Sequence, residues 1–132
     1  MLDSNLLIRL DHDDPVAIAA VDRLRGEALV VPFQVALEFA CGTRDPDDAL
    51  QAVAAAFDLE RPEEPTLQEA ARLIARARSK GRRVASGDAW IAASAALRSD
   101  YVVTANKRHF RTLGVSAWNY MREKSPPQDR SR

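Results

Sequence analysis

Short apolar runs alternate along this chain with longer segments of helical character, and this alternation constrains the fold more than any other feature. Apolar runs occupy residues 28–33 and 101–104, and residues 115–118 are a further candidate strand. Such runs are typical of strands buried on both faces of a parallel sheet. Strands separated by helices imply parallel pairing through right-handed crossovers. The sequence therefore predicts an α/β protein, a three-layer α/β/α sandwich built on a small parallel sheet.

The predicted helices begin and end at recognisable signals. Pro15 opens one helix, with Asp13 or Asp14 placed to cap it, and Gly26 ends it. A capping box, Thr-Leu-Gln-Glu, starts another helix at Thr66, and Ser86 is placed to cap the next one. The remaining expectations are a strand, turn and helix over 2–10, helices over 35–41, 46–57 and 87–98, a short strand within 58–65, and a helical turn near 110.

The length of 132 residues fits one compact domain. We assign residues 1–122 to this domain and expect residues 123–132, which are rich in Pro, Ser and charge, to form a disordered tail. No apolar run suits a membrane span, and Asp3 stands where a signal peptide needs apolar residues, so we expect a cytoplasmic protein. Cys41 is the only cysteine, and we expect it to be buried and unreactive.

The charge is balanced overall, with 19 basic and 19 acidic residues, but it is unevenly distributed. Acidic residues dominate 45–69, and basic residues follow within 72–83 and 107–111. The balance argues against a protein that coats nucleic acid nonspecifically, whereas a local basic group can still bind phosphate. The candidates for RNA phosphate contacts, or alternatively for a solvated basic face, are Arg82, Arg83, Lys107 and Arg108.

Four polar residues are candidates for a common site, and three of them, Asp3, Glu38 and Asp88, stand among apolar or small residues. Asp3 and Asn106 each follow a strand, Glu38 interrupts an apolar helix, and Asp88 lies in a first helical turn. Ligands of open α/β sheets bind at the carboxyl ends of the strands, so these residues can meet there. Structural roles stay open for each: a helix cap or turn for Asp3 and Asn106, a wet helix face for Glu38, and a favourable charge at a helix start for Asp88.

Three carboxylates at one edge would repel each other without a cation. Mg²⁺ and Mn²⁺ prefer oxygen ligands, and Mg²⁺ is commonly held by one or two carboxylates together with water and substrate phosphate. Phosphodiester hydrolysis by metal-activated water follows from such a site. The sequence has no phosphate-binding Walker loop and no G-x-S-x-G nucleophile motif. Asp100 precedes its strand and is excluded from the site.

Other reactive side chains are given structural interpretations. His12 and His109 lie among charged residues and are expected to be solvated, although His109 is placed to approach RNA near Asn106. Trp90 and Trp118 stand in apolar segments, which favours packing in the core or an interface over base stacking. The acidic residues of the connector are expected to be solvated charge: Glu60, Glu63 and Glu64.

Four segments resemble, in order, the motifs of the PIN domain ribonucleases. They are MLDSNLLI at 1–8, VALEFACG at 35–42, GDAWIAA at 87–93 and VVTANKRHF at 102–110. Each motif is weak alone, but four in this order cover nearly the whole predicted domain. Within the family, the chain is most similar to the VapC-type toxins of type II toxin–antitoxin pairs.

The resemblance implies a Mg²⁺- or Mn²⁺-dependent endoribonuclease that forms a homodimer or higher oligomer. It also implies inhibition by a small antitoxin whose tail occupies the acidic groove. The implied catalytic residues are Asp3, Glu38, Asp88 and Asn106, with the three carboxylates as metal ligands. The implied supporting residues are Ser4 and Asn5, which would orient Asp3, and Thr104, which would bind a ligand carboxylate or a metal-bound water.

Two departures from the family pattern keep alternatives open. Only Met1 and Leu2 precede the first Asp, so the first strand is short or begins upstream, and Asn106 stands where an acid is common. The chain could therefore be an RNA-processing nuclease without an antitoxin, or a degenerate module that binds RNA or protein without cleaving. A phosphatase with an aspartyl nucleophile would need a second Asp at position 5, which is Asn.

Overall fold

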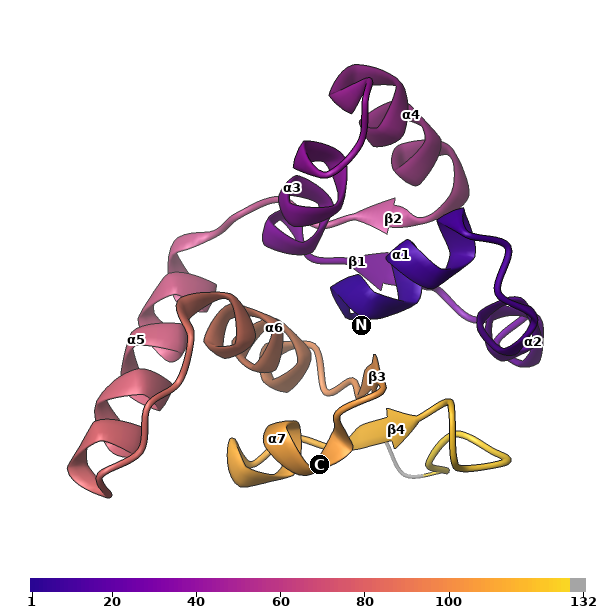
Figure 1. Ribbon diagram of the computed structural model, residues 1–132. Helices are drawn as coiled ribbons and strands as arrows, with labels where there is room; N and C mark the ends of the chain where they lie inside the picture. The colour runs from indigo at the N-terminus through magenta and orange to yellow at the C-terminus, as the bar shows by residue number, and fades with distance from the viewer. Residues whose placement is uncertain (129–132) are drawn as a thin grey trace.

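Strands and helices alternate along the chain in a computed structural model, which describes residues 1–128 (Figure 1). The two strand pairs, β1 (Val30–Val31) with β2 (Asp58–Leu59) and β3 (Val102–Thr104) with β4 (Ala117–Asn119), are both parallel. The predicted α/β class with small parallel sheets is confirmed. The strands are shorter than the apolar runs that predict them.

Leu2 connects the two strand pairs. It forms a parallel bridge with Val103, and its N–H donates to the carbonyl of Val30 at 2.9 Å. The parallel rows therefore run in the order β2, β1, Leu2, β3, β4. The strand expected near the N-terminus is reduced to this one residue, because a helix begins two positions later. Asp3 thus stands at the carboxyl edge in the middle of the sheet.

Seven helices surround these strands within residues 1–128. Their bounds are α1 Ser4–Asp11, α2 Pro15–Arg23, α3 Phe33–Cys41, α4 Pro46–Ala56, α5 Glu64–Ser79, α6 Ser86–Leu97 and α7 Lys107–Thr112. The predicted cap of α2 is confirmed, since Asp14 accepts a bond from the backbone N–H of Val16. The capping box at Thr66 is wrong: α5 starts at Glu64, and Thr66 is a buried residue inside it. Ser86 is likewise the first helical residue of α6 and not its cap.

The core lies between the sheet and the helices, and its largest fully buried side chain is Trp118. Figure 1 shows α3 and α4 above β1 and β2, whereas α7 lies beside β4 at the lower edge. Trp90 is also buried and meets Phe33 edge to face, with ring centroids 4.8 Å apart, so both tryptophans pack as predicted. None of the helices within residues 1–128 is long and apolar enough to cross a membrane.

Two predictions about burial are wrong. Cys41 is exposed, because it lies in the last turn of α3 on the side away from the core. Glu60 is buried and only 5% exposed. Its carboxylate accepts bonds from the indole N–H of Trp90, at 2.8 Å, and from the hydroxyl of Ser94. The connector looks solvated in sequence, but β2 carries Glu60 underneath α6, where these donors replace water.

The structure describes the first part of the predicted tail, residues 123–128. Glu123 accepts a bond from the ammonium of Lys107, and its carbonyl accepts one from the indole of Trp118. These contacts tie the first residue of the tail to α7 and β4. The end of the tail, 129–132, lies outside the described residues.

Candidate metal centre

Asp3 lies at the centre of the candidate site. It is 8% exposed and caps α1, where one carboxylate oxygen, Oδ1, accepts the backbone N–H of Ser4 at 2.8 Å. The other oxygen, Oδ2, accepts the hydroxyl of Thr104 at 2.7 Å. Burial raises the pKa of Asp3 above its usual value, although both hydrogen bonds act in the opposite direction. A buried carboxylate with this pKa shift is placed to gain from a nearby cation.

Thr104 connects two of the segments that resemble the family motifs. Its side chain is fully buried at the end of β3. The hydroxyl donates to Asp3 and accepts the backbone N–H of Asn106 at 3.0 Å. One side chain therefore holds both the carboxylate of Asp3 and the backbone at the start of α7. This geometry corresponds to the ligand-carboxylate contact that the sequence suggested for Thr104.

Asp88 lies in the first turn of α6 and remains partly exposed. Its Oδ2 is 3.1 Å from Nε2 of His109 on α7. The interpretation of His109 as a freely solvated residue is therefore wrong. A sequence signal was present, because His109 follows Asn106 by one helical turn and belongs to the same motif segment. The contact joins the start of α6 to α7.

Glu38 lies on α3 and is exposed, as its alternative interpretation as a wet-face residue predicted. Its Oε1 accepts a bond from the side-chain amide of Gln34, one turn earlier. That amide also lies against Gly87, since a Cβ placed on Gly87 would overlap it. Gln34 thus fills the space between α3 and the residue preceding Asp88.

The three carboxylates interact electrostatically. The negative charges of Asp88 and Glu38 both raise the pKa of Asp3, in addition to its burial. Within residues 1–128, however, no three His, Cys, Asp or Glu side chains form a ready metal-binding cluster. Each of the outer two carboxylates is engaged by its own neighbour, His109 for Asp88 and Gln34 for Glu38. The charges of the three carboxylates therefore act on one another, but the three side chains do not surround a common point.

The remaining predicted polar residues occupy separate positions. The side chain of Asn5 accepts a bond from the hydroxyl of Tyr120 at 3.1 Å, so its described contact is with Tyr120 and not with Asp3. Ser4 contacts Asp3 through its backbone N–H. Asn106 is exposed and lines a cavity of about 650 Å³. Sequence proximity to Asp3 therefore does not by itself make a residue its partner.

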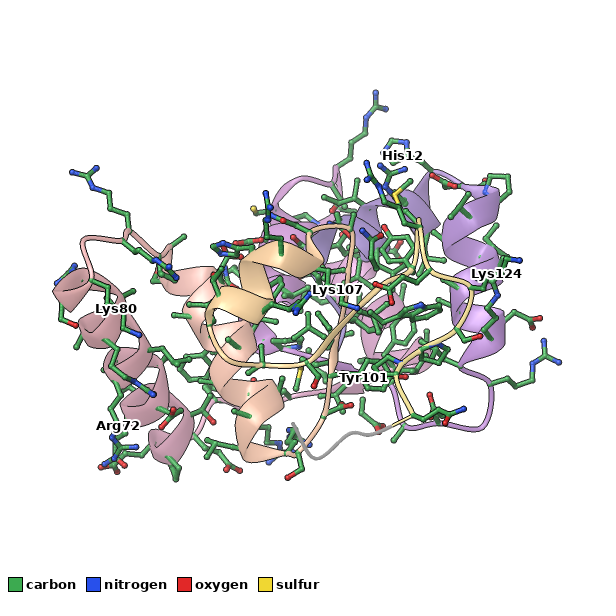
Figure 2. All side chains as sticks on the ribbon, turned by 90° about the horizontal axis from the view of Figure 1, so that it is seen from below. His12, Arg72, Lys80, Tyr101, Lys107 and Lys124 are labelled. Atoms are coloured by element: carbon green, nitrogen blue, oxygen red, sulfur yellow. The ribbon has the colours of Figure 1, made fainter. Side chains whose placement is uncertain are left out.

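The basic residues predicted to contact RNA fall into two cavities on either side of α7. Arg82 and Arg83 line a cavity of about 460 Å³ between α5 and α7, together with His109. Arg108 and Lys107 line the cavity of Asn106 on the other side. The ammonium of Lys107 is already paired, 2.7 Å from the carboxylate of Glu123. In Figure 2, Lys107 lies on α7 near the middle of the molecule, whereas Lys80 lies at the far end of α5.

The donor set suits a hard divalent cation, because every candidate ligand offers carboxylate oxygen. Mg²⁺ needs only one or two carboxylates when water and substrate phosphate complete its shell. Asp3 has the strongest need for a cation, since burial and two like charges oppose its ionisation. The chemistry of these residues therefore fits such an ion, which Asp3 would hold together with the neighbouring carboxylates.

Comparison with known proteins identifies the fold. Among solved structures, the chain is similar to VapBC-1 from nontypeable Haemophilus influenzae, with a TM-score of 0.75 and 21% identity over 92% of this chain and 98% of that one. It is similar to FitAcB from Neisseria gonorrhoeae, with a TM-score of 0.74 and 21% identity over 92% and 98%. For VapBC2 from Rickettsia felis, bound to a DNA fragment from its promoter, the values are 0.76 and 16% over 89% and 97%.

No curated protein sequence is similar enough to this chain to count as a match. The family model of the PIN domain matches residues 1–115. This range includes β1, β2 and β3, the three carboxylates and all of α7, and it ends just before β4. The chain therefore belongs to the PIN domain family.

Proposed function

We propose that this protein is a metal-dependent endoribonuclease that acts as the toxin of a toxin–antitoxin pair. The observation that carries the proposal is the buried carboxylate of Asp3, on which the charges of Asp88 and Glu38 act together. Membership of a family of nucleases supports phosphodiester hydrolysis. The similarity to VapBC and FitAcB structures supports the toxin role.

Each residue of the site has a distinct task in this proposal. Asp3 and Asp88 bind Mg²⁺ or Mn²⁺ directly, and Thr104 keeps Asp3 in a fixed orientation through its hydrogen bond. Glu38 would act through a bound water, because its side chain is exposed on α3. Asn106 is placed to orient water or substrate with its amide. A divalent ion in this position supplies an activated water and stabilises the charge that develops on the phosphate.

The RNA would be held by phosphate contacts from Arg82, Arg83, Lys107 and Arg108. Their guanidinium and ammonium groups suit phosphate and carry little sequence information. The proposal is supported by the lining of the two cavities beside α7: His109, which contacts Asp88, lines the cavity of Arg82 and Arg83, and Asn106 lines that of Lys107 and Arg108.

The partners belong to the same proposal. A small antitoxin would bind the protein and block its acidic groove, and two or more copies would assemble in the cytoplasm. The similar structures are named as VapBC and FitAcB, which supports a paired protein. The alternative of a non-cleaving RNA- or protein-binding module is favoured by one feature, the amide of Asn106 in place of a fourth acid.

The test is cleavage of structured RNA in Mn²⁺ by the wild type and by variants with one amide in place of one carboxylate. Asp3→Asn and Asp88→Asn should lose cleavage, whereas Asp47→Asn, an exposed residue of α4, should keep it. Equal cleavage by the wild type and the three variants would contradict the assignment of the site to Asp3 and Asp88. Absence of cleavage by the wild type across several RNAs would favour the non-cleaving module. An antitoxin gene beside this one would separate the toxin from an RNA-processing nuclease of the same fold.

A further inference from the structure

Three arginines gather around the cavity that Asn106 lines. The cavity has a volume of about 650 Å³ and lies between α7, the end of β4 and the turn that follows it. Arg108 and Arg111 line it from α7, and Arg122 lines it from the opposite wall. Arg111 and Arg122 belong to none of the segments that resemble the family motifs. This volume lies in the range of small-ligand sites, about 300–1,000 Å³.

The arginines of this cavity have no acidic partner among the described residues. Within residues 1–128, the ion pairs at this end of the molecule include Lys107 with Glu123, but none with Arg108, Arg111 or Arg122. Glu123, the nearby carboxylate, therefore neutralises the lysine and leaves three guanidinium charges around one space. Like charges so arranged repel each other, and an anion between them relieves the repulsion. Guanidinium groups bind phosphate in a two-pronged geometry that lysine lacks.

The position of the cavity relates it to the candidate metal centre. Asn106 lines the cavity, and its backbone N–H donates to Thr104. The same Thr104 hydroxyl donates to Asp3. Two hydrogen bonds, through the buried Thr104, therefore connect a residue that lines this cavity to Asp3, whereas His109 lines the other basic cavity.

We propose that this cavity binds a backbone phosphate of the RNA strand adjacent to the phosphate that is cleaved, with Arg111 and Arg122 as its principal contacts. The proposal rests on the proposed function for the identity of the strand. It differs from the sequence-based set of RNA contacts in two respects. It adds two arginines that the motifs do not include, and it ranks Lys107 below them because its charge is already paired with Glu123.

RNA is favoured over an acidic protein segment by the neighbourhood of the site. A substrate cleaved at Asp3 and Asp88 extends on both sides of the cleaved bond, and its backbone carries one phosphate per nucleotide. Both cavities border α7, since Asn106 and Arg111 line one and His109 lines the other. A strand that crosses α7 between them would meet the arginines of the first cavity and Arg82 and Arg83 of the second.

The experiment measures RNA binding in EDTA, where metal-dependent cleavage does not occur. The affinity of a fluorescent single-stranded RNA is followed by anisotropy at several salt concentrations. The double variant Arg111→Ala/Arg122→Ala is compared with Arg44→Ala/Arg78→Ala, which removes the same charge from exposed residues that line neither cavity. For two lost phosphate contacts, the slope of log affinity against log salt should become shallower by about 1.4.

The control double variant should keep the wild-type slope, and Lys107→Ala should change it less than Arg111→Ala does. Equal losses in the two double variants, or an unchanged slope in the cavity variant, would overturn the proposal. Binding of a polyglutamate peptide is measured in parallel. Loss of peptide binding with RNA binding intact would assign the cavity to an acidic protein segment and also overturn it.

These outcomes are separate from those of the proposed function. A wild type that binds RNA through the cavity but does not cleave in Mn²⁺ would contradict the nuclease and leave the phosphate subsite standing. A wild type that cleaves, with a cavity variant that binds RNA normally, would contradict the subsite alone.

Discussion

Replacement of Thr104 by valine removes one hydroxyl from the centre of the site at nearly constant volume. Thr104 is fully buried, so no solvent can replace the bond that its hydroxyl donates to Asp3. The variant also removes the acceptor of the backbone N–H of Asn106. A bond to a charged group contributes about 1.5–3 kcal/mol, and a neutral one about 0.5–1.5 kcal/mol. Because Asn106 is exposed and water can reach its backbone, we expect a total loss of about 2–3 kcal/mol.

The cost of this variant should depend on pH in a defined direction. The hydroxyl of Thr104 stabilises the ionised form of Asp3, so its removal raises the folded-state pKa of Asp3 further above the usual value of 3.8. The stability difference between wild type and variant is therefore fully present above the folded-state pKa of the variant. The difference decreases as the pH falls below that pKa and then below the folded-state pKa of the wild type, because both proteins then carry a neutral Asp3.

The assay is urea unfolding of metal-free protein, followed by the fluorescence of the buried Trp118. At neutral pH the midpoint should fall by about 1–2 M for an ordinary denaturant slope. Thr43→Val is the matched control, since its hydroxyl donates to the backbone carbonyl of Ala40 and not to a carboxylate. It should lose less than about 1 kcal/mol at every pH. A loss for Thr104→Val below about 0.5 kcal/mol, or one that does not change with pH, would refute the reasoning.

Three further predictions concern stability and metal. Glu60→Ala should destabilise the protein by about 3 kcal/mol in urea unfolding, because it leaves buried donors of α6 unpaired; a loss below about 1 kcal/mol would contradict this. Gly87→Ala should displace the amide of Gln34, so that Glu38 loses the bond that holds its carboxylate in position. Cleavage in Mn²⁺ should then fall while stability changes by less than about 1 kcal/mol; unchanged cleavage would argue against a role for the Gln34–Glu38 bond. Because the folded-state pKa of Asp3 is raised, stability is lost as the pH rises from the unfolded-state pKa through the folded-state pKa, so metal-free Asp3→Asn should be at least as stable as wild type at neutral pH. Saturating Mn²⁺ should then raise the melting temperature of the wild type by several degrees but not that of Asp3→Asn; equal shifts would place the ion elsewhere.

Local signals predicted much of the architecture. The alternation of apolar runs and helical segments is a property of neighbouring residues, and it predicted the α/β class. Pro15 and Asp14 correctly predicted the start of α2. The apparent capping box at Thr66 failed because two preceding residues, Glu64 and Pro65, already adopt helical geometry.

Contacts between distant segments were beyond local signals. Glu60 looks like one more solvated acid, because its sequence neighbours are polar. Its donors come from α6, 30 and 34 positions along the chain, and they reach it only in the packed structure. The contact of His109 with Asp88 arises in the same way, from the packing of α7 beside the start of α6.

The sequence by itself determined which residues are candidates for the chemistry: Asp3, Glu38 and Asp88 stand out as charged groups among apolar or small residues, and Asn106 as the polar residue after a strand. Only the tertiary structure decided which side chains these candidate residues contact. Thr104 holds Asp3, His109 lies beside Asp88, and three arginines line the cavity of Asn106. The physical reason is that a chain's pattern reports burial one segment at a time, whereas charge and hydrogen bonding depend on distances that exist only once the segments have packed.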